Sequence, residues 1–190
     1  MVRTLPTAVL LLSAALLVGC SPQPGPLDDA PPSSSTPVPA TGDGLPVDAA
    51  PQISGGRESW VECPYLDTDW VAETNGQKVT GVGVDDNFSH PACVFWSYPE
   101  QPQLEVTIRE LPDAGTATAV VDWAAPVDTT EPAEEIEGWS GGRAGAGIGG
   151  HESAVYAVAK ENWAVVVRSN QAQSLKAELV AREVINNLGL

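Results

Sequence analysis

The chain has 190 residues, of which 25 are acidic and nine are basic, and its formal net charge is −16. A surface of that sign repels the phosphates of nucleic acids and the headgroups of anionic lipids, so we expect no nucleic-acid partner. Hydrophobic residues make up 43% of the chain, which is enough for one ordinary folded core.

The first nineteen residues have the features of a cleavable export signal. Arg3 precedes an apolar run over residues 8–18 that is too short to span a bilayer. The run ends in Leu17-Val18-Gly19-Cys20, which resembles the lipobox of bacterial lipoproteins. That resemblance implies cleavage before Cys20, acyl chains such as palmitate on the new terminus, and anchoring on the extracytoplasmic face of the cell membrane. An ordinary secretory signal is the alternative, and it too exports the domain.

Residues 20–58 are expected to form a disordered tether behind the lipidated cysteine. They are rich in Pro, Ser, Ala, Gly and Asp, and they hold almost no large apolar side chain. Such a sequence cannot bury enough surface to offset the entropy lost on ordering. The predicted organisation is therefore a signal peptide over 1–19, a tether over 20–58 and one globular domain over 59–190.

Cys63 and Cys93 are the remaining cysteines of the chain. Thiols outside the cytoplasm tend to pair, so we expect a disulfide between them. Two free buried thiols are one alternative. Half of a metal site is the other, but zinc would need two further ligands, for which only His90 and His151 are available.

The first predicted element is a short helix that Asp67 caps at its start and Gly76 ends. Strands are predicted over residues 78–84, 92–98 and 103–111. The second is apolar at both parities, as expected of a strand covered on both faces. The third alternates, and its inward positions are Leu104, Val106 and Ile108.

A second helix is predicted after Asp113, and a hairpin is predicted from residues 154–159 and 163–168. A last helix is expected to begin near residues 169–170. The second helix presents one apolar stripe, made of Ala117, Val120, Val121 and Ala124. Hairpins linked by helices favour an α+β fold, in which an antiparallel sheet of about five or six strands packs with three helices.

Three sequence features carry a resemblance to known families. They are Cys63-Pro64-Tyr65-Leu66, a helix ending at Gly76, and Cys93-Val94-Phe95-Trp96. The pattern resembles small actinobacterial cell-envelope lipoproteins that are filed as domains of unknown function. The resemblance implies a disulfide from the first helix to a central strand and a fold like the PsbP sandwich. It implies no catalytic residues.

No pattern in the sequence points to catalysis or to a cofactor. His151 and Ser153 stand two apart at the start of a predicted strand, where a base and a nucleophile rarely align. Residues 145–150 have the glycine spacing of a dinucleotide-binding turn, but a strand follows them where that turn requires a helix. We therefore expect no catalytic residue, no cofactor and no metal site, and we expect that the protein is not an enzyme.

The tryptophans offer the remaining functional signal, with Trp60 and Trp139 as the candidates for exposure. Trp139 and Arg143 lie in a glycine-rich stretch, residues 138–152, which we expect to be a loop that contacts a partner. The predicted function is a non-catalytic binding or interaction module with an unknown protein or lipid partner. A lipid or glycolipid carrier and an unrecognised cell-wall hydrolase are the alternatives.

Overall fold

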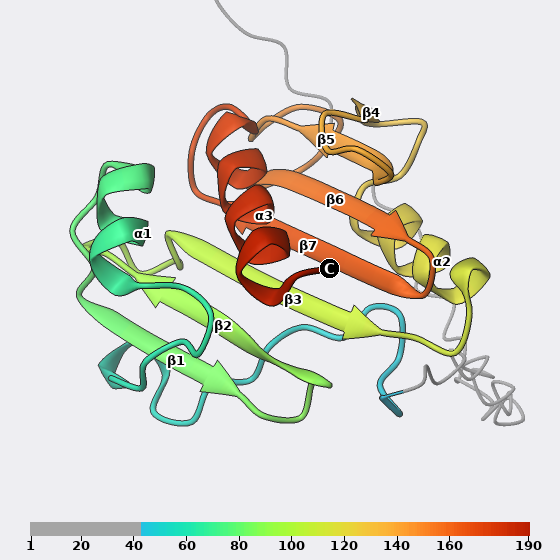
Figure 1. Cartoon of the computed structure of the whole chain (residues 1–190). Coiled ribbons are helices and arrows are strands. Elements are labelled where there is room, and N and C mark those ends of the chain that lie inside the picture. The colour runs from blue at the N-terminus through green and yellow to red at the C-terminus, as the bar shows by residue number, and fades with distance from the viewer. Residues whose placement is uncertain (1–42) are drawn as a thin grey trace, which may run out of the picture. The chain divides into compact units, whose positions relative to one another are not determined.

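Seven strands form one antiparallel sheet in the order β1-β2-β3-β7-β6-β5-β4 (Figure 1). The computed structural model describes residues 43–190. The strands are Gly81–Asp85 (β1), His90–Trp96 (β2), Leu104–Glu110 (β3), Glu131–Ala133 (β4), Ser140–Ala144 (β5), Ala154–Lys160 (β6) and Trp163–Ser169 (β7). The central pairing, β3 with β7, joins the strands of the first half of the domain to those of the second.

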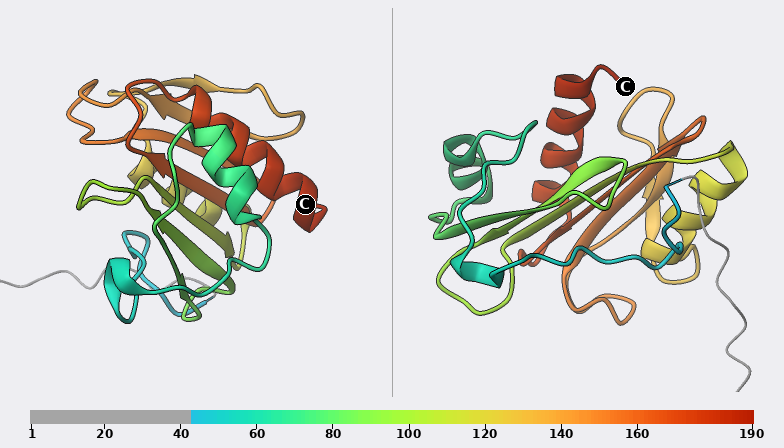
Figure 2. Two further views of the ribbon diagram at one scale, coloured as in Figure 1. Left: turned by 90° about the vertical axis from the view of Figure 1, so that its left-hand side faces the viewer. Right: turned by 90° about the horizontal axis from the view of Figure 1, so that it is seen from below.

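Helices cover both faces of the sheet (Figure 2). They are α1 (Thr68–Asn75), α2 (Ala114–Ala124) and α3 (Leu175–Leu188), and a single 3-10 turn spans Gly56–Glu58. Helices α1 and α3 lie on one face, which we call the α3 face, and α2 lies on the opposite α2 face. None of the helices found between residues 43 and 190 combines the length and hydropathy needed to cross a bilayer.

Several predicted features are confirmed. Asp67 and Asp113 cap α1 and α2 by accepting hydrogen bonds from the backbone amides of Trp70 and Thr116, both at 2.8 Å. The inward positions of β3 are fully buried under α3. The apolar stripe of α2 packs in a second cluster with Val155 and other residues of β6 and β7. Three helices and an antiparallel sheet were expected and are found.

The expected disulfide joins Cys63 to Cys93, with a Cα–Cα distance of 5.7 Å. Closing a loop across a sequence separation of 30 residues contributes roughly 3 kcal/mol in the chain-entropy model. Two hydrogen bonds fix the neighbouring segment: the Tyr65 hydroxyl donates to the Pro91 carbonyl at 2.8 Å, and the Asn187 amide donates to the Tyr65 carbonyl at 3.1 Å. The chain before α1 is thereby attached to both β2 and α3.

Residues 43–59, which we name the N-terminal strap, lie across the α2 face (Figure 2). The expected disordered tether extended to residue 58, whereas the structure places residues 43–58 against the folded domain. Arg109, a buried residue of β3, donates to both carboxylate oxygens of Asp43, at 2.6 and 2.9 Å. It also donates to the carbonyl oxygens of Leu45 and Pro46. The strap is ordered because a buried guanidinium needs these acceptors. Cys20, the predicted signal peptide and the predicted tether up to residue 42 lie outside the described residues.

Two glycines of β1 allow the strap to approach the sheet. A Cβ atom at Gly81 would collide with the carbonyl oxygen of Arg57, and one at Gly83 would collide with the side chain of Ile53. The Asp85 carboxylate then accepts a hydrogen bond from the amide of Gln52 at 2.8 Å. Alternate glycines therefore give β1 one flat face on which the strap packs.

The sheet has seven strands and not the expected five or six, because β4 and β5 carry no strand-like apolar pattern. β5 contains Gly141 and Gly142, where a Cβ atom would collide with neighbouring backbone. β4 is a three-residue edge strand that contains Pro132. Within the expected loop over 138–152, residues 140–144 are therefore strand. The last helix also begins later than expected, at Leu175.

We predict that Asp43→Ala lowers the free energy of unfolding by about 3–5 kcal/mol, because it removes one partner of a buried ion pair. Urea unfolding followed by circular dichroism measures the change. Asp48→Ala removes an exposed carboxylate from the same strap and is the control, with an expected effect within about 0.5 kcal/mol. Equal effects of the two changes would contradict the anchoring role of Asp43.

Candidate functional site

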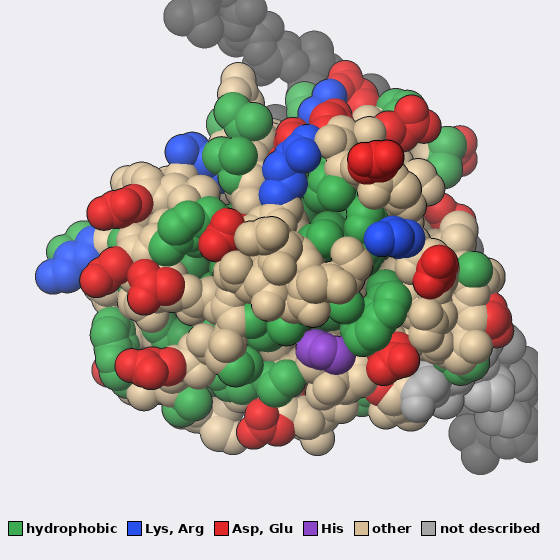
Figure 3. Space-filling model, viewed as in Figure 1, with side chains coloured by type: hydrophobic (Ala, Val, Ile, Leu, Met, Phe, Trp, Pro, Cys, Tyr) green, Lys and Arg blue, Asp and Glu red, His purple; other side chains and the backbone are tan. Residues whose placement is uncertain are grey.

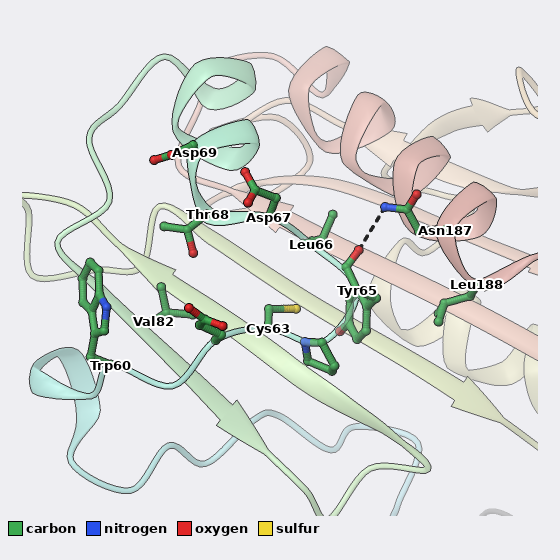
Figure 4. A pocket seen from close by; sticks show the side chains of 12 residues that line it. Trp60, Cys63, Tyr65, Leu66, Asp67, Thr68, Asp69, Val82, Asn187 and Leu188 are labelled. Atoms are coloured by element: carbon green, nitrogen blue, oxygen red, sulfur yellow. Dashed lines mark hydrogen bonds between the residues drawn. The ribbon is translucent and has the colours of Figure 1, made fainter.

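A groove of about 680 Å³ lies on the α3 face between β1 and the C-terminal end of α3 (Figure 4). We name it the Trp60 groove, after the exposed indole that forms one side. Its lining residues are Trp60, Glu62, Cys63, Pro64, Tyr65, Leu66, Asp67, Thr68, Asp69, Val82, Asn187 and Leu188.

The Trp60 groove has a fixed backbone. Trp60 forms a parallel bridge with Val82, and the amide of Val61 donates to the Val82 carbonyl at 2.8 Å. The disulfide and the bonds of Tyr65 hold the segment that crosses from Trp60 to α1. The side chains that line the groove therefore stand on anchored elements.

The chemistry of the groove is aromatic and acidic. Trp60 is 61% exposed, as expected from its position at the edge of the fold. The carboxylates of Glu62, Asp67 and Asp69 are exposed around the same space. Figure 3 shows that acidic side chains are spread widely over this face of the molecule. The groove is suited to a cation that can contact an indole ring.

A second space, of about 810 Å³, lies at the end of the central strands and includes side chains of the α2 face. We name it the Arg168 pocket. The strands β3 and β7, the β2–β3 loop and the segment before β6 form its walls. Its lining residues are Gln101, Pro102, Glu105, Gly150, His151, Glu152, Ser153, Arg168, Ser169 and Asn170.

Two opposite charges lie side by side in this pocket, and both side chains are half-buried. Glu105 and Arg168 are directly opposite each other in the β3–β7 ladder, yet their side chains form no ion pair within 4.0 Å in the described chain. Burial raises the pKa of the Glu105 carboxyl and lowers the pKa of the Arg168 guanidinium, and each charge partly opposes the shift of the other. The guanidinium lies 5.2 Å from the centre of the Trp123 ring, which holds it by a cation–π contact.

A buried polar network supports the walls of the Arg168 pocket. Ser169 donates to the Asn75 side chain at 3.1 Å, and Asn75 in turn donates to the Gln103 side chain at 3.0 Å. The backbone amide of Asn170 donates to the Gln103 carbonyl at 3.1 Å. These bonds fix the ends of β3 and β7 on which the two charged side chains stand.

The sequence-predicted partner contacts, Trp139 and Arg143, are placed differently from the expectation. Trp139 is only 3% exposed, because the chain folds it into the core on the α3 face. Arg143 forms ion pairs with Glu135 at 2.7 Å and with Glu178 at 3.6 Å. Trp139 is thus not a surface contact, and Arg143 serves to attach α3 to the segment before β5.

His151 and Ser153 both line the Arg168 pocket, but no hydrogen bond joins their side chains in the described chain. The Nε2 atom of His151 lies 3.4 Å from the Thr129 hydroxyl. Between residues 43 and 190, no group of three or more His, Cys, Asp or Glu side chains is placed to hold a metal ion. Sequence reasoning missed Glu105 and Arg168, which it treated as solvent-facing positions of amphipathic strands.

We predict that Glu105→Gln raises the melting temperature near pH 7 and has little effect near pH 3. A carboxyl whose pKa is raised by folding stabilises the folded state below its unfolded pKa, and this contribution is lost as the pH rises through the folded pKa. The charged side chain therefore destabilises the protein at neutral pH, and glutamine removes that cost. Thermal unfolding of the variant and of Glu110→Gln, an exposed control on the same strand, tests this. A melting temperature that falls only in Glu105→Gln at neutral pH would refute it.

Comparison with known proteins places the whole folded part in one family. A family model described as a domain of unknown function, DUF2020, matches residues 45–190. A search of curated proteins found no match to the chain. The matched range includes the strap from Leu45 onward and the lining of both pockets. The expectation of a family of unknown function is confirmed, and the chain belongs to the DUF2020 family.

Proposed function

We propose that the domain is a non-catalytic module that binds a basic segment of a partner protein in the Trp60 groove. The exposure of Trp60 beside three carboxylates carries the proposal. An exposed tryptophan on an anchored backbone is a common anchor of protein interfaces. The surrounding carboxylates favour a lysine or arginine over an anionic or apolar ligand.

The backbone of this sheet edge is already paired at Val82 with residues 59–61. The amide of Val82 donates to the Ser59 carbonyl, and its carbonyl accepts from Val61. Addition of a partner strand along the full length of β1 is thereby blocked. Recognition in the groove therefore rests on side chains: the indole for cation–π contact and the carboxylates for charge.

We further propose that the protein is a lipoprotein of the actinobacterial cell membrane with a PsbP-like fold. The Leu17-Val18-Gly19-Cys20 motif supports the anchor, and a disulfide in the folded domain agrees with an extracytoplasmic site. An antiparallel sheet between helices agrees with the sandwich fold.

The lipid anchor has a direct test. In a bacterial host that processes lipoproteins, Cys20→Ala is expected to move the protein from the membrane fraction to the soluble exported fraction, because it removes the acylated sulfur. Metabolic labelling with palmitate measures the acylation, and Cys63→Ala is the control that keeps Cys20. Equal labelling of the parent and of Cys20→Ala would disprove the anchor.

The Trp60 groove is tested by titration with a short synthetic peptide of alternating lysine and glycine, measured by calorimetry at low salt. We expect Trp60→Ala to weaken binding by about 2 kcal/mol, as for a central interface tryptophan. Tyr98→Ala removes another exposed aromatic side chain, outside the groove, and is expected to change nothing.

Two other outcomes would redirect the proposal. Binding that Trp60→Ala and Tyr98→Ala leave equally strong would mean that net charge alone attracts the peptide. Protein purified from the envelope of its host with a stoichiometric extractable lipid would favour the carrier alternative.

A further inference from the structure

We propose that the Arg168 pocket binds a free α-amino acid, with the ligand carboxylate on Arg168 and the ligand ammonium on Glu105. The inference goes beyond the proposed function, because this pocket and the Trp60 groove share no residue. The starting observation is the pair of opposite charges that stand side by side in the β3–β7 ladder without a direct ion pair.

Neither charge has a hydrogen-bonded or ion-paired protein partner among residues 43–190. The Arg168 guanidinium lies over the Trp123 ring, and no hydrogen bond from it to another group is found in the described chain. The Glu105 carboxylate likewise accepts no hydrogen bond from residues 43–190. The other two arginines on strands of the sheet, Arg109 and Arg143, bond to acidic side chains. Both side chains are half-buried, so a ligand that carries the opposite charges can reach them and form charge-assisted hydrogen bonds.

The spacing of the two groups favours a zwitterion over a simple anion or cation. Directly opposite residues of an antiparallel pair have Cβ atoms about 4.5–5.5 Å apart, so one small molecule reaches both side chains. An α-amino acid carries its carboxylate and its ammonium on the same carbon atom. A lone anion would meet the carboxylates of Glu105 and Glu152, and a lone cation would meet Arg168.

The remaining walls suit the rest of such a ligand. Ser153, Asn170 and His151 offer hydrogen-bonding groups around the opening. The segment before β6 is held in a turn, in which the Gly147 amide donates to the His151 carbonyl at 2.7 Å and the His151 amide donates to the Ile148 carbonyl at 3.0 Å. The Trp123 contact and these turns place the polar groups before any ligand enters.

Calorimetric titration of the mature protein with L-serine and D-serine tests the proposal, with acetate and ethylamine as probes that each carry one of the two charges. Serine is expected to bind, and each single-charge probe is expected to bind at least about tenfold more weakly. Arg168→Met and Glu105→Gln are each expected to weaken serine binding at least about tenfold. Lys160→Met and Glu110→Gln, which remove charges elsewhere on β6 and β3, are the controls and should bind as the parent does.

The comparison of serine with acetate and ethylamine uses the parent protein alone, so it stands even if a variant fails to fold. No heat of binding with serine up to about 10 mM would overturn the proposal. Acetate binding as tightly as serine would overturn it as well and would leave a plain carboxylate site at Arg168. Trp60→Ala is expected to keep serine binding, so failure of this inference and failure of the Trp60 groove are separate results.

Discussion

The buried pairing of Arg109 with Asp43 determines how the α2 face of this domain is covered. Arg109 points from the central strand β3 to a face that α2 covers only over β5, β6 and β7. The strap covers this part of the face and removes the guanidinium from water, so the strap must also supply its hydrogen-bond acceptors. Two carboxylate oxygens and two backbone carbonyls satisfy it, and they bring the strap across β1 and β2. The second face of the sheet is therefore closed by an irregular segment and not by a fourth helix.

Much of the fold could be predicted from the sequence, because β3 and α2 carry clear periodicities and Asp67 and Asp113 are regular caps. β5 could not be predicted, because the close approach of neighbouring backbone requires glycine in this strand. The strand therefore shows no alternating apolar pattern. The strap resembles a disordered tether in composition, and its order depends on a contact with residue 109, far along the chain. One signal was available: β2 is apolar at both parities, which requires a cover on each face.

Of the two candidate sites, the sequence indicated Trp60 but not the pair of Glu105 and Arg168. Trp60 was recognised because an indole at the edge of a fold has few places to be buried. Glu105 and Arg168 alternate with core residues, a pattern that normally marks solvent-facing positions. They become a site only because long-range pairing places β3 beside β7 and loops from two other connections enclose them. The sites lie apart, so either could change without loss of the other.

The strap also has a mechanical consequence. A pull on the chain from the N-terminal side of Asp43 is transmitted to the sheet at Arg109, on a strand bonded on both sides over most of its length. The edge strand β1 and the Trp60 groove take no load until that ion pair has ruptured and the strap has peeled away. The domain can thus bear tension through its own leading segment while the shape of the groove is preserved.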